Sequence, residues 1–169
     1  MNFRRIATPF LIVLGFSSLS VAQTKISGYV KCSKPDQVQK IDVGDKPDHV
    51  FTISQNKCAW TQPMQIEGIQ TKEDVITNSG EMSGTKAKTH GFVIDTLSNG
   101  DKFYARTHGT DKFQSGGNVQ SSQGWWSFEG GTGKLAGIKG EGTYKGRPDP
   151  TDPTSLIFQV EGQYEFAKK

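Results

Sequence analysis

The sequence predicts an all-β protein: a single antiparallel β-barrel of about eight strands, with little helix. Three observations predict it. Apolar and polar residues alternate over many short segments, turn signals separate those segments, and no long window has apolar residues at the helical period. The chain also holds 20 Gly and 7 Pro. Glycines within strands favour a barrel because closure needs sharp bends and close backbone approach.

Residues 1–22 have the pattern of a cleavable export signal. Arg4 and Arg5 precede an apolar run over 10–16, and small side chains at Ser20 and Ala22 predict cleavage between Ala22 and Gln23. The run is much shorter than the roughly 20 residues that span a bilayer. We therefore expect one domain over residues 23–169, secreted or periplasmic, with no stable membrane anchor after cleavage.

The charge of the chain gives no support to nucleic-acid binding. The formal net charge is +3, from 20 basic and 17 acidic residues. Loss of Arg4 and Arg5 with the signal would leave 18 and 17, or +1. The remaining basic residues are scattered among acids, whereas a nucleic-acid-binding protein needs a clustered basic face. We expect no nucleic-acid partner.

Two cysteines, Cys32 and Cys58, follow the predicted signal. An even count in an exported protein predicts one disulfide between them. The alternative is a pair of reduced, buried thiols. The cysteines are not spaced as CxxC, so the sequence does not support thiol redox catalysis.

The strand pattern is clear in the middle of the chain. Trp60, Met64 and Ile66 alternate with polar residues. Segments 89–97 and 101–108 flank Asn99-Gly100, a strong signal for a tight hairpin because both positions tolerate positive φ. This hairpin would place His90 opposite His108.

The remaining segments complete the predicted barrel. Gly116-Gly117-Asn118 predicts a second hairpin, leading into a strand in which Trp125 and Trp126 must point to opposite faces. Residues 146–153 contain three prolines and are predicted to be an exposed loop. A last strand over 155–166 has period-two alternation, with Leu156, Phe158, Val160, Tyr164 and Phe166 on one face.

The glycine-rich stretch Trp126-Ser127-Phe128-Glu129-Gly130-Gly131-Thr132-Gly133-Lys134-Leu135-Ala136-Gly137-Ile138-Lys139-Gly140-Glu141-Gly142-Thr143-Tyr144 resembles the late hairpin of allene oxide cyclase and dirigent-type β-barrels. Most of the chain after residue 22 is also similar to small secreted bacterial proteins of undefined function. Those share the order of Lys31-Cys32, a segment over 53–60, and this hairpin. The resemblance implies a barrel of the calycin type. It transfers no catalytic residue to this sequence.

The candidate ligand-binding residues are aromatic or lie on one predicted strand face: Trp60, Tyr104, Arg106, His108, Trp126 and Tyr144. Catalytic residues cannot be named, because no nucleophile motif with a base and an acid is present. The three histidines lack metal-ligand spacing, and Gly131-Thr132-Gly133-Lys134 does not fit a phosphate loop. We therefore expect no metal and no cofactor, although His90 and His108 could meet in space.

Two kinds of function fit this sequence. The first is a secreted or periplasmic barrel that binds a small apolar ligand or serves a structural role in the envelope, with an oligomer possible. The alternative is a cofactor-free isomerase or cyclase acting inside the barrel. A cavity with convergent polar groups would favour a ligand or substrate inside. A filled interior with an exposed aromatic patch would favour surface contacts.

Overall fold

The computed structural model describes residues 23–166. The predicted signal at 1–22, with its cleavage site, and residues 167–169 lie outside the described residues. The described part contains ten strands and one short 3-10 helix: β1 (Thr24–Cys32), β2 (Val38–Asp42), β3 (His49–Gln62), β4 (Gln65–Ile66), β5 (Ile69–Ser83), β6 (Lys86–Leu97), β7 (Lys102–Phe113), β8 (Val119–Gly131), η1 (Gly133–Leu135), β9 (Ile138–Pro148) and β10 (Leu156–Phe166).

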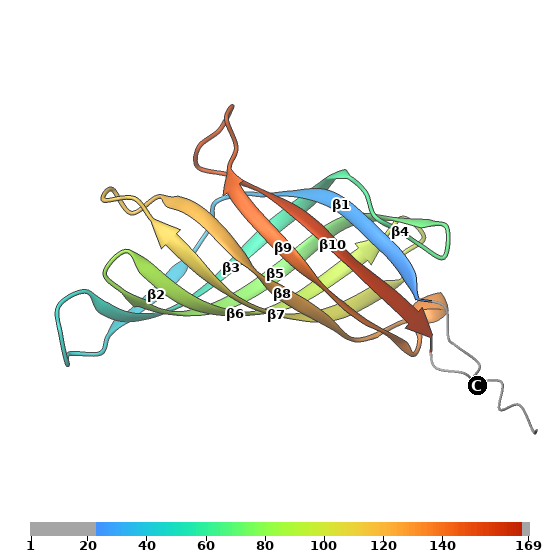
Figure 1. Cartoon of the computed structure of the whole chain (residues 1–169), viewed down its shortest axis with the longest axis horizontal. Helices are drawn as coiled ribbons and strands as arrows, with labels where there is room; N and C mark the ends of the chain where they lie inside the picture. The colour runs from blue at the N-terminus through green and yellow to red at the C-terminus, as the bar shows by residue number, and fades with distance from the viewer. Residues whose placement is uncertain (1–22, 167–169) are drawn as a thin grey trace, which may run out of the picture.

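Eight of these strands form a closed antiparallel barrel in the order β3-β1-β10-β9-β8-β7-β6-β5, because β5 pairs again with β3. Figure 1 shows the barrel from the side, with the long axis of the molecule horizontal. The prediction of an all-β barrel of about eight strands is confirmed. The short β4 pairs with β5, and β2 continues beside the first half of β3 where β1 has ended. Within residues 23–166, no helix has the length and apolar character needed to cross a membrane.

Both predicted hairpins are present. The β6–β7 turn has Gly100 at a φ of 89°, and the β7–β8 turn has Gly117 at a φ of 82°. Such positive φ values are accessible to glycine without steric cost. The first hairpin places His90 directly opposite His108, as the sequence predicts.

The structure corrects the predicted loop over residues 146–153. Strand β9 extends to Pro148, so Gly146 and Arg147 pair with Phe158 and Ile157 of β10. The loop itself begins at Asp149. Proline is tolerated at Pro148 because a strand end can lack one ladder donor.

The two ends of the barrel interior differ. The end at η1, on the right in Figure 1, is closed by an apolar cluster that includes Leu97, Phe103, Phe128, Leu135 and Ile138. Trp126 packs edge-to-face against Phe128 in this cluster. The opposite half is lined by polar and small side chains that alternate with the outward-facing ones: Thr52, Asn78, Thr89, Thr107, Asp111 and Ser122.

A disulfide between Cys32 and Cys58 joins β1 to β3, with the two Cα atoms 4.0 Å apart. The predicted pairing is therefore present. The bridge is buried between Val30 and Trp60, and Asp74 lies opposite Cys58 on β5. A disulfide here is compatible with a location outside the cytoplasm.

Candidate functional site

Trp125 stands on the outer wall of the barrel. Side chains alternate along β8, so Trp125 points outward, with 49% of its surface exposed, while Trp126 points inward and is 5% exposed. The neighbouring strand β7 places His108 opposite Trp125. The two rings stack with centroids 4.3 Å apart and planes 18° apart. Trp125 is therefore held as a flat, half-exposed platform.

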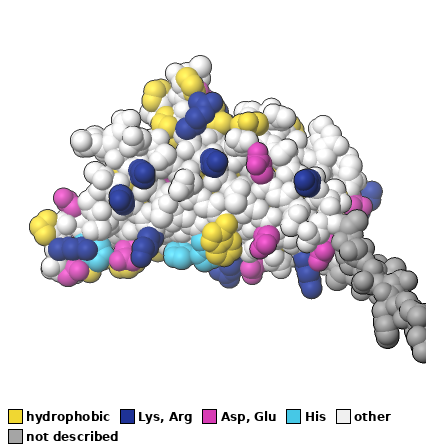
Figure 2. Space-filling model, in the orientation of Figure 1, with side chains coloured by type: hydrophobic (Ala, Val, Ile, Leu, Met, Phe, Trp, Pro, Cys, Tyr) yellow, Lys and Arg dark blue, Asp and Glu magenta, His cyan; other side chains and the backbone are white. Residues whose placement is uncertain are grey.

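The platform continues onto β6 through a histidine pair. His90 lies opposite His108, and their Nδ1 atoms are 2.7 Å apart, so that one ring donates a hydrogen bond to the other. Their rings meet edge to face at 4.7 Å. We call Trp125, His108 and His90 the aromatic row. Figure 2 shows histidine side chains beside a hydrophobic one on the near face, over β6 to β8.

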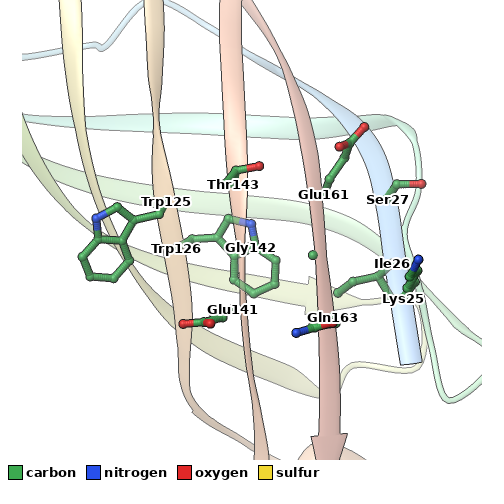
Figure 3. Close-up of a pocket in the computed structure, with 11 residues that line it drawn as sticks. Lys25, Ile26, Ser27, Trp125, Trp126, Glu141, Gly142, Thr143, Glu161 and Gln163 are labelled. Atoms are coloured by element: carbon green, nitrogen blue, oxygen red, sulfur yellow. The ribbon is translucent and has the colours of Figure 1, made fainter. Parts of the chain in front are cut away.

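A hollow of about 720 Å³ lies on one side of Trp125, toward β1. Its walls carry Glu141, Glu161, Lys25, Ser27 and Gln163, and we call it the acidic hollow. Figure 3 shows Glu161 and Ser27 on one side of its floor and Glu141, Gln163 and Lys25 on the other. The backbone of Gly142 and Gly162 forms part of the floor, and the ring of Trp126 packs against the inner side of these glycines.

A second hollow of about 720 Å³ lies on the other side of Trp125, over β6 to β9. Its walls carry Lys88, Lys145, Thr110 and Gln123 beside the two histidines, and we call it the basic hollow. Its lining, drawn from the described residues, holds no carboxylate. Trp125 thus separates two polar hollows of opposite charge, both open to solvent.

Chemically, this wall combines a flat aromatic face with many hydrogen-bonding groups at short range. The hydroxyls of Ser27, Thr110 and Thr143 and the amides of Gln123 and Gln163 can each both donate and accept hydrogen bonds. An aromatic face attracts C–H groups, and the flanking side chains can bind hydroxyl groups at the rim of the same ligand.

The interior holds a different set of polar groups. Trp60 donates a 2.6 Å hydrogen bond from Nε1 to Asp95, and Asp74 lies opposite Asp95 on the next strand. Burial raises the pKa of Asp74 to about 7. Burial, and then the charge of Asp74, raise the pKa of Asp95 well above its usual range. The two carboxyl groups therefore favour their neutral forms.

A second interior group lies nearer the open half. Burial raises the pKa of Asp111. It also raises the pKa of Tyr144, to which the nearby charge of Asp111 adds. Tyr144 packs against Phe158, and its hydroxyl covers Gly109. Its ring fills space that a ligand inside the barrel would otherwise take.

The six candidate ligand-binding residues divide between the two walls. Trp60, Trp126 and Tyr144 point into the barrel, whereas Tyr104, Arg106 and His108 point outward. Arg106 pairs with Glu129 at 3.3 Å and lies over the ring of Phe92, against which Tyr104 stacks. The structure therefore does not bring the six together, and only His108 belongs to the aromatic row.

The sequence prediction left out Trp125 and His90 of the aromatic row, and also the charged and polar side chains of the two hollows. The available signal was the Trp125-Trp126 pair, which requires one ring on each face. The sequence prediction selected Trp126, which lies within the packed core.

Comparisons with known proteins leave the family open. No family model matches the chain, and no curated protein matches it. A solved structure of a conserved protein of unknown function from Rhodopseudomonas palustris is similar to it, with a TM-score of 0.47 and 10% identity. The match covers 85% of this chain and 99% of that chain.

Proposed function

We propose that this protein is a secreted or periplasmic binding protein that holds a saccharide against the outer wall of its barrel. The sugar ring would stack on Trp125, with its hydroxyl groups bound from the acidic and basic hollows. The observation that carries the proposal is the exposure of Trp125, held flat by His108 between two hollows of hydrogen-bonding side chains. Exposed aromatic surface rimmed by polar groups marks binding sites.

A saccharide fits this wall better than a purely apolar ligand. An apolar ligand gains most where it is enclosed by apolar side chains, whereas both hollows are open and charged. The closed half of the interior is occupied by Trp126, Phe128 and Phe103 in contact with one another. The location outside the cytoplasm rests on the signal pattern and the disulfide. Nothing in the described residues favours the isomerase or cyclase alternative.

The test is saccharide titration followed by tryptophan fluorescence and calorimetry. The probes are oligosaccharides of glucose, N-acetylglucosamine and galacturonic acid, tested separately. We expect at least one of them to change the fluorescence of the unmodified protein, and Trp125→Ala to weaken its binding at least tenfold. His108→Ala should weaken binding less, because it removes only the support of the ring.

The matched control is Tyr29→Ala, which removes another exposed aromatic side chain three strands away from β8. We expect this variant to bind as the unmodified protein does. Absence of binding to all three probes, or equal weakening by Tyr29→Ala and Trp125→Ala, would contradict the proposal.

A further inference from the structure

The edge of β2 is open. β2 ends the order of paired strands and pairs only with β3, so its second edge has no partner among the described residues. All five of its residues are exposed. In Figure 1, β2 lies at the left end of the molecule, away from η1. An exposed strand edge is a template for another strand, and proteins usually cover or blunt it.

The face of the sheet beside this edge is apolar. Ile41 of β2 lies opposite Phe51 of β3, with Ile53 two residues further along β3. The exposed fractions of these three side chains are 66%, 48% and 56%. Figure 2 shows hydrophobic side chains at the left end of the molecule, where the β2–β3 hairpin lies. Clustered apolar exposure of this kind marks an interaction surface.

The hydrogen-bond pattern shows which groups the edge offers. The N–H of Val43 donates to the carbonyl of His49 at 3.0 Å, so Val43 and Ile41 direct their backbone groups toward β3. Pairing alternates along an antiparallel ladder. Val38, Lys40 and Asp42 therefore direct their N–H and C=O groups to the free edge.

We propose that two copies of the chain pair antiparallel through these edges, with Ile41 on the two-fold axis. This register places Lys40 of each copy opposite Asp42 of the other and Ile41 opposite Ile41. Shifting the register by two residues places Lys40 opposite Lys40, or Asp42 opposite Asp42. Opposite charges across strands stabilise and like charges destabilise. The edge is therefore complementary to a second copy of itself in one register.

The pairing also reduces the exposure of Ile41. In the proposed register the two Ile41 side chains form a non-hydrogen-bonded pair, in which Cβ atoms come within about 5.5 Å. Phe51 flanks this contact in each copy.

A closed two-fold contact satisfies both edges at once, so assembly stops at the dimer. The proposal does not depend on saccharide binding, because β2 contributes no residue to either hollow.

The test is the oligomeric state of the purified protein, measured by sedimentation and light scattering over a range of concentrations. We expect a dimer. In a dimer of Lys40→Asp, or in a dimer of Asp42→Lys, positions 40 and 42 carry like charges, and they face each other twice. Each variant should therefore dimerise at least tenfold more weakly. An equimolar mixture of the two variants opposes unlike charges, so we expect heterodimers to form again.

Two controls accompany these variants. Lys72→Asp reverses an exposed lysine on β5, outside the edge, and should leave the dimer unchanged. Circular dichroism confirms that each variant is folded before mixing. A monomer at all concentrations overturns the proposal and leaves the edge to a strand from another protein. Charge-reversed variants that stay dimeric, or a mixture that stays monomeric, overturn this register.

Discussion

Trp125 and Trp126 are adjacent in the chain, yet Trp125 is half-exposed on the outer wall and Trp126 belongs to the core. The difference follows from what their neighbours across the sheet provide. Trp126 lies opposite Gly142, next to Gly162, and its ring fills the slot that these two glycines leave. Trp125 lies opposite Thr143, next to Glu161, on the solvent side. The same residue type is therefore buried on one wall and leaves half of its ring exposed to solvent on the other.

The largest expected effect is the loss of the inner ring. Trp126→Ala should lower the free energy of unfolding by about 4 kcal/mol, because it removes a large buried side chain and leaves a cavity. The measurement is guanidinium denaturation. Trp126→Phe should cost less, since Nε1 of Trp126 is buried without a hydrogen-bond partner among the described residues. A cost below about 1 kcal/mol for Trp126→Ala would show that the ring is not essential to packing.

A second substitution tests the same contact from the side of the glycines, by adding a side chain where the ring of Trp126 packs. A Cβ atom at Gly162 would lie 2.5 Å from Cζ2 of Trp126 and 2.6 Å from the carbonyl oxygen of Glu141. Gly162→Ala should therefore lower the free energy of unfolding by about 3 kcal/mol, the upper part of the range for overpacking, because backbone atoms cannot move aside easily. Gly116→Ala is the matched control, since nothing lies within 4 Å of its Cβ position. If Gly162→Ala and Gly116→Ala lowered the free energy of unfolding equally, the packing of Trp126 would not require a glycine at position 162.

The buried carboxyl groups of the inner wall predict a pH dependence of the free energy of unfolding. Because the pKa of Asp74 is raised to about 7 in the folded protein, folded and unfolded chains are both protonated at this site below about pH 4. Its contribution to stability is fully present there. It is lost as the pH rises through about 7, where the buried carboxyl ionises.

Replacing Asp74 with its uncharged analogue tests this dependence. Asp74→Asn should raise the free energy of unfolding at pH 8 by about 2 kcal/mol and flatten its fall between pH 4 and pH 7. Some pH dependence should remain in this variant, because Asp95 lies opposite position 74 and its own pKa is raised. Thermal melts at several pH values measure the effect. If the stability of the unmodified protein and of Asp74→Asn changed in parallel with pH, Asp74 would not be the source of the pH dependence.

The sequence predicted the fold class and several of the strands, but it gave the direction in which a strand face points only where the local pattern was strong. Asn99-Gly100 located one hairpin, and alternation over 155–166 identified the inward face of β10, because both signals are local. On β7 the sequence placed Tyr104, Arg106 and His108 on one face without deciding whether it points inward. The answer depends on other strands. The interior receives large rings from β8 and β9, so β7 contributes the small Ala105, Thr107 and Gly109 there.

The candidate site was less predictable for the same reason. The aromatic row needs the register of β6, β7 and β8 together, because His90, His108 and Trp125 come from three strands. Local patterns fixed the first pairing, through the tight turn at Asn99-Gly100. The second pairing includes register shifts near both ends of the β7–β8 pair, which alternation alone does not reveal.

The smallest expected effect on stability is at the outer ring, and it separates binding from packing. Trp125→Ala should change the free energy of unfolding by less than about 0.5 kcal/mol, as is usual for surface substitutions, because half of the ring is already in water. The substitution removes the stacking of the indole on His108 and leaves the core unchanged. The same denaturation experiment applies. A cost close to that of Trp126→Ala would mean that Trp125 serves the fold, and any loss of saccharide binding would then follow from damage to the wall.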